Sequence, residues 1–94
     1  MNVEKELQLE TNRSSFNFIL KEHRKGVIYM GSQIDTCIYI IYTNEKGEQT
    51  YKTIPLGTQP LCGILASDDE VLLIGGYNEM ILYFSIAEEN LLDP

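Results

Sequence analysis

The stretch VLLIGGYNEMILYFSI, residues 71–86, decides the fold class of this chain. Its only charged residue is Glu79, and two apolar runs flank the glycine-containing segment at residues 75–79. In residues 81–86 both sets of alternating side chains are largely apolar, whereas a strand with one wet face alternates apolar and polar residues. The pattern therefore predicts strands that are covered on both faces, as in stacked β-sheets.

Further strand-like runs occur from Phe16 onward, each bounded by a polar or glycine-containing turn. They cover residues 16–20, 27–30, 37–43, 50–54 and 61–66. Residues 44–48 predict a hairpin, because Asn and Gly adopt a positive φ at little cost. No segment keeps the helical period over three turns, so the chain is predicted to be all-β, with antiparallel strands.

Composition excludes several classes of protein. The length of 94 residues allows one domain at most, and the apolar fraction of 44% is that of a globular protein. The net charge is −7, from 14 acidic and 7 basic residues, which disfavours a nucleic-acid partner because such binding depends on clustered Lys and Arg. The nearest basic cluster, residues 21–25, is interpreted as a solvated turn.

The chain carries no sign of a membrane or secretory segment. No run approaches the roughly 20 apolar residues that span a bilayer, so no membrane partner is expected. Residues 1–6 are charged and lack the apolar centre of a signal peptide. Cys37 and Cys62 lie in apolar runs, so we expect reduced, buried thiols in a cytoplasmic protein, with a bridge between them as the alternative.

An internal repeat with a period near 44 residues relates the two halves of the chain. Residues 27–31 align with residues 71–75 at an offset of 44. Ile38 aligns with Ile81 at an offset of 43, because the first unit gains one residue in a turn, where insertions are tolerated. A unit of four short strands with this period is typical of a β-propeller blade.

The repeat divides the chain into four parts. Residues 1–15 form a polar segment with the pattern of either a helix start or a short strand. The first blade-like unit covers residues 16–50, the second covers residues 51–87, and residues 88–94 form an acidic tail. A small β barrel or sandwich remains the alternative, because evenly spaced strands give apparent repeats there as well.

Residues 75–85 combine a glycine, a polar turn and alternating apolar residues that end in an aromatic residue and a serine. They resemble the third strand of the WD-repeat β-propeller family, which follows a Gly-Ser-x-Asp-Gly turn and ends in Trp-Asp. The resemblance places Gly75 at the glycine, Asn78 at the structural Asp, Ile81 at the aliphatic residue, Phe84 at the Trp and Ser85 at the closing Asp. Turn and core roles are implied for these positions.

The first unit is similar through residues 31–35, so Gly31, Asp35 and Ile38 receive the same turn and core roles. Both units depart from the family pattern, since neither has Trp-Asp or the Gly-His pair. The buried hydrogen-bond network of such blades is therefore absent, and we expect divergent blades held by apolar packing. Two blades do not close a ring, because propellers typically have at least four.

No catalytic, cofactor or metal site is predicted. His23 is the only histidine, and it has no nearby cysteine pair that could complete a zinc site. Cys37 has no histidine base in its sequence context, so a packed thiol is favoured over a nucleophile. Residues 68–70 lack the alternating oxygen ligands and the glycine of a calcium loop, and they are interpreted as a turn.

These observations predict a non-enzymatic scaffold for protein–protein interaction in an intracellular assembly, of the cytoskeletal or ciliary kind among others. Its partners would be other protein chains, in a hetero-complex or a homo-oligomer that covers the open blades. Tyr42 and Tyr77 are the candidate contacts, because amphipathic aromatic residues are favoured at interfaces. The alternative is a free-standing β domain that oligomerises or binds an apolar ligand.

Overall fold

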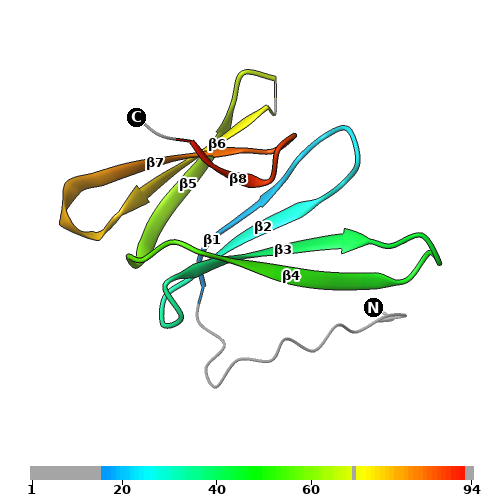
Figure 1. Ribbon diagram of the computed structural model, residues 1–94, viewed down its shortest axis with the longest axis horizontal. Coiled ribbons are helices and arrows are strands. Elements are labelled where there is room, and N and C mark those ends of the chain that lie inside the picture. Colours follow the sequence, from blue (N-terminus) through cyan, green and yellow to red (C-terminus); the bar gives the residue numbers. More distant parts are fainter. Residues whose placement is uncertain (1–15, 69, 93–94) are drawn as a thin grey trace, which may run out of the picture.

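The computed structural model describes residues 16–68 and 70–92, which form two four-stranded antiparallel sheets (Figure 1). The first sheet contains β1 (Phe16–Lys21), β2 (Ile28–Ser32), β3 (Cys37–Thr43) and β4 (Gln49–Pro55), in that order. The second contains β5 (Pro60–Ala66), β6 (Val71–Gly76), β7 (Met80–Ser85) and β8 (Asn90–Leu92), with the 3-10 helix η1 (Tyr77–Glu79) after β6. The prediction of an all-β chain built from antiparallel four-stranded units is confirmed.

The sheets divide the chain at different places from the predicted units 16–50 and 51–87. All seven residues of β4 pair with β3, because the hairpin at residues 44–48 returns the chain along that strand. Residues 51–55 therefore belong to the first sheet. At the other end, β8 pairs with β7, so part of the predicted tail is an edge strand. The predicted N-terminal segment, 1–15, lies outside the described residues.

The two sheets share the same local geometry. β1 is bulged against β2 between Phe16 and Phe18, and β5 is bulged against β6 between Pro60 and Cys62. β5 begins 44 residues after β1, and β7 begins 43 residues after β3. The repeat seen in the sequence therefore corresponds to a repeat of strands in the structure. It includes the β-bulge, which lies near the start of the first strand in both sheets.

The sheets stack face to face, and the core lies between them. Its fully buried apolar side chains come from both sheets: Ile38 of β3, Leu72 and Ile74 of β6, and Phe84 of β7. The Tyr29 ring meets the Phe84 ring edge-on, with centroids 6.3 Å apart. Burying each such side chain contributes about 1.5–3 kcal/mol. Cys37, Tyr39 and Ile41 are also buried, on the other side of the first sheet.

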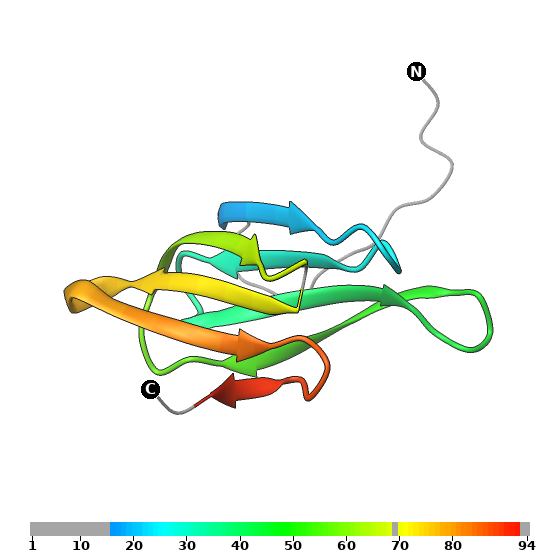
Figure 2. The same cartoon turned by 90° about the horizontal axis from the view of Figure 1, so that it is seen from above.

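The sheets approach most closely where β5 runs beside β1 and β2 (Figures 1 and 2). The Phe18 ring fills this place between two glycines. A Cβ atom would lie 2.2 Å from the ring at Gly31 and 2.7 Å from it at Gly63. The Asn17 side chain also donates a hydrogen bond to the Pro60 carbonyl at 2.8 Å. Side chains larger than glycine at these two positions would therefore push the sheets apart.

Candidate interaction surfaces

The predicted core residues divide between two faces. Ile38 and Phe84 are fully buried between the sheets, as expected for core positions. Ile81 is 63% exposed, because it is three residues before Phe84 in β7 and so points to the opposite face of the sheet. Ile81 therefore lies outside the core, on a face that none of the described residues covers.

The two predicted turn glycines lie inside strands. Gly31 is in β2 and Gly75 is in β6, each directly opposite the residue that follows the bulge. A Cβ atom at Gly75 would lie 2.7 Å from Cys62 Sγ, just as one at Gly31 would meet Phe18. Both glycines therefore make room for a cross-strand side chain, and the tight turns are formed by the residues after them.

Asp35 lies in the turn between β2 and β3, where it was expected, and it joins a small polar network. The Ser32 hydroxyl accepts a hydrogen bond from the Asp35 amide at 3.0 Å and donates to its carboxylate at 3.3 Å. The Tyr39 hydroxyl donates to the same carboxylate at 2.9 Å. Asn78, at the corresponding place in the second sheet, lies in η1. The spacing of Ser32 and Asp35 is a known local capping pattern, and it was the available signal for this network.

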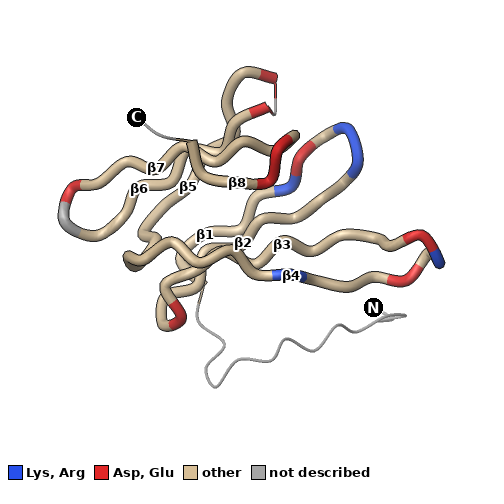
Figure 3. The backbone as a smooth tube through the Cα atoms, viewed as in Figure 1, with Lys and Arg blue, Asp and Glu red and all other residues tan. Residues whose placement is uncertain are grey.

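The second sheet has an uncovered apolar face. None of its four strands contains Asp, Glu, Lys or Arg, and the charged residues near it lie in its turns (Figure 3). The side chains that point away from the first sheet define what we call the open face: Cys62, Ile64, Leu73, Ile81, Tyr83 and Leu92. Ile64 is 60% exposed and Tyr83 is 40% exposed. The sequence predicted that both faces of this sheet are covered, whereas residues 16–68 and 70–92 cover only one of them.

A groove of about 750 Å³ lies between the sheets at the end formed by the β1–β2 turn. Its rim carries both charges, with Arg24 and Lys25 on one side and Glu70 and Glu89 on the other. Lys52 forms an ion pair with Glu89. The lining also contains apolar side chains, among them Val27, Ile40 and Ile86, so the groove is mixed in character.

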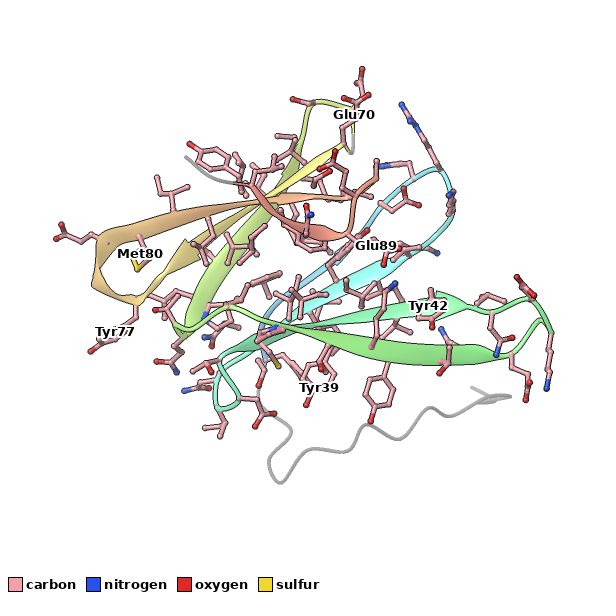
Figure 4. The ribbon with its side chains drawn as sticks, in the orientation of Figure 1. Tyr39, Tyr42, Glu70, Tyr77, Met80 and Glu89 are labelled. Carbon is pink, nitrogen blue, oxygen red and sulfur yellow. The ribbon has the colours of Figure 1, made fainter. Side chains whose placement is uncertain are left out.

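The two predicted contact tyrosines lie at opposite ends of the molecule (Figure 4). Tyr42 is half-buried in the groove, and Lys52 Nζ lies 5.1 Å from the centre of its ring. Tyr77 is 56% exposed in η1. The structure does not bring them into one surface, so a single partner would have to cover the whole length of the sheets to contact both.

The two cysteines are free and differ in exposure. Cys37 is buried, and Cys62 is exposed on the open face. Burial raises the pKa of the Cys37 thiol, and the nearby Asp35 carboxylate raises it further. A thiol with a raised pKa is a poor nucleophile, and so the structure supplies no activation for Cys37.

Within residues 16–68 and 70–92, no three His, Cys, Asp or Glu side chains lie close enough together to hold a metal ion. None of the described helices has the length and apolar character needed to cross a bilayer. Comparisons with protein-family models, with curated proteins and with solved structures find no match to this chain.

Proposed function

We propose that this chain is a non-enzymatic scaffold for protein–protein interaction, built from two divergent WD-repeat-like blades and working within an intracellular assembly. The open face of the second sheet is the observation that carries the proposal. Contiguous apolar patches are uncommon on monomeric proteins and mark places where another protein docks. In this chain the patch runs across all four strands of a sheet and carries no charge.

The packing of the two sheets supports the blade-like reading of this surface. Sheet-on-sheet contact already buries the inner face of the second sheet, where Leu72 and Phe84 are fully buried. The open face is also largely apolar, so a second layer of the same kind would suit it.

The experiment that tests the proposal compares the tagged chain with Ile64→Glu in extracts of the cells that make the protein. A charge at the centre of a protein interface costs several kcal/mol when it is left unpaired. We expect wild type to recover a defined set of proteins and Ile64→Glu to lose it. Ile34→Glu changes an isoleucine in the β2–β3 turn that is 43% exposed, and it serves as the matched control that keeps the partners.

Recovery of the same proteins by wild type and Ile64→Glu would show that the open face does not bind them. If wild type recovers no protein and does not associate with itself, the scaffold function fails.

A further inference from the structure

The two sheets stack head to tail, so their contact joins two different faces. The first sheet packs through Phe18, Leu20, Tyr29, Ile38 and Ile40. The shared bulges and registers place Cys62, Ile64, Leu73, Ile81 and Tyr83 at the corresponding positions of the second sheet. These residues form the open face. The second sheet therefore presents outward the face that the first sheet uses to bind it.

The outward side of the first sheet corresponds, by the same registers, to the inner face of the second. Ile19, Ile28 and Met30 on this side correspond to Gly63, Leu72 and Ile74. Ile19 is 63% exposed, while Ile28 and Met30 are half-buried. On β3 the same side carries Cys37, Tyr39 and Ile41, which are already buried, so the accessible part of this face lies along β1 and β2. Ile19 is on β1, and the corresponding strand β5 makes the closest contact between the existing sheets. Ile28 and Met30 are on β2, which corresponds to β6. One chain thus carries the open face and, along β1 and β2, an accessible part of the face that matches it.

The sizes of the side chains also match across the two faces. Inside the chain the large Phe18 packs over Gly63. At the corresponding place between two chains, the small Cys62 of one would lie over the large Ile19 of the other. Large and small residues are exchanged at this position while their combined volume remains similar, which is the condition for close packing.

Charge favours the same arrangement. The existing groove is lined by Glu22, Arg24 and Lys25 from the end of β1 and the β1–β2 turn, and by Glu70 and Glu89 from the second sheet. The ion pair across it joins Lys52 of the first sheet to Glu89. The corresponding turn of the second sheet is acidic, with Asp68 and Glu70 (Figure 3). Stacking a second chain head to tail would place this acidic turn against the basic β1–β2 turn of the other chain, so opposite charges meet again.

Pairing of two open faces with each other lacks this advantage. The face has Asp68 and Glu70 at one end and Glu79 at the other. Aligned sheets would therefore bring acidic groups together whichever way the strands run, and like charges at an interface are unfavourable.

We propose that the open face binds a second copy of this chain through the outward face of its first sheet, around Ile19, Ile28 and Met30. This inference rests on the proposed scaffold function and names its partner. When two chains associate through two different faces, one chain keeps a free open face and the other keeps a free outward face. Further association through these faces gives a ring or a filament. A ring of two copies would contain four sheets, the smallest number found in propellers.

The test uses the 94-residue chain and two variants with matched exposure, Ile81→Glu on the open face and Ile19→Glu on the outward face of the first sheet. Light scattering and analytical ultracentrifugation give the mass of each alone and of their equimolar mixture. Wild type is expected to associate, and each variant alone is expected to weaken association by about a hundredfold, since a charge is buried unpaired.

The mass of the equimolar mixture shows whether the open face binds the outward face of the first sheet. Ile81→Glu keeps an intact first sheet, and Ile19→Glu keeps an intact open face, so together they restore one contact and give a 1:1 dimer. The variant carrying both substitutions is expected to be monomeric and folded by circular dichroism, and Ile34→Glu is expected to associate as wild type does.

Three outcomes would overturn the proposal. If Ile19→Glu alone associates as wild type does, the open faces pair with each other. If both variants are monomeric and their mixture is monomeric as well, the two faces do not bind each other. If wild type itself is monomeric, the occupant is a different protein, and the extract experiment then shows whether the scaffold function still holds.

Discussion

Ile38 and Ile81 occupy corresponding positions in the two sheets, and yet one is fully buried and the other is 63% exposed. Both lie opposite a glycine on the neighbouring strand, Gly31 for Ile38 and Gly75 for Ile81. Their strands have similar composition, so local sequence does not set their burial. The difference comes from the layer above, which for Ile38 is the second sheet and for Ile81 is solvent.

The comparison separates two sources of stability. The contact between the sheets stabilises the isolated chain, whereas the open face contributes only when another molecule covers it. Substitutions at corresponding positions should therefore have unequal effects on the free energy of unfolding. Ile19→Glu, in which we expect a monomer, is the background in which these effects are measured without association.

Phe84→Ala is expected to have the largest effect. The side chain is fully buried and its ring contacts Tyr29 across the two sheets. Removing it should lower the free energy of unfolding by about 3–5 kcal/mol, because a cavity is left between the sheets. Urea denaturation followed by circular dichroism measures this loss. A loss below about 1 kcal/mol, the size typical of an average substitution, would mean that the sheets are not held together at this point.

The pair Ile38→Ala and Ile81→Ala tests the comparison directly. Ile38→Ala should cost about 2–5 kcal/mol, since it empties a buried site. Ile81→Ala should change the free energy of unfolding by less than about 0.5 kcal/mol in the monomeric background. The same denaturation experiment measures both. Equal losses at the two positions would show that the open face is covered even in the single chain.

Gly31→Ala and Gly75→Ala sharpen the comparison at the neighbouring position. The added methyl group at Gly31 meets the Phe18 ring, which Gly63 holds from the other side, so we expect a loss of about 1–3 kcal/mol. At Gly75 it meets only the Cys62 thiol, which is exposed and free to rotate, so the loss should be smaller. Thermal unfolding monitored by fluorescence or circular dichroism is sufficient. A greater loss at Gly75 would contradict the head-to-tail packing.

The smallest effect concerns the Cys37 thiol and pH. Folding raises its pKa above the ordinary value of 9.0, so the folded state favours the neutral thiol. The stability that this group contributes is complete below pH 9.0 and is lost as the pH rises through the higher folded pKa. Urea denaturation at pH 8 and above pH 9 should show a steeper loss for wild type than for Cys37→Ala. If the free energy of unfolding falls equally with pH in wild type and Cys37→Ala, the thiol is not buried.

The sequence allowed the class of the fold to be predicted, because strand runs and turn residues are local signals. The repeat was also visible, since Gly31 and Gly75 stand at the same step of each unit. The assignment of residues 51–54 to the second unit differed from the structure, because pairing through a hairpin depends on which strand the chain returns to. Sequence periodicity distinguishes strands with two apolar faces from strands with one. It does not show whether another sheet covers each of those faces.

The candidate surface was only partly predictable for the same reason. Apolar residues on both sides of β7 indicated that something must cover the sheet, and the structure shows which side is uncovered. Tyr42 and Tyr77 were chosen by residue type alone, and they lie too far apart to act together (Figure 4). The network of Ser32, Asp35 and Tyr39 required three-dimensional proximity between a turn and a strand, although part of its spacing was visible.

The Phe18 ring between Gly31 and Gly63 has a mechanical consequence. Sliding one sheet along the other by one pleat repeat, two residues or about 7 Å, would move Gly63 away and bring Leu65 under the ring. A leucine side chain does not fit the space that a glycine leaves. The ring therefore opposes sliding of one sheet along the other at this point.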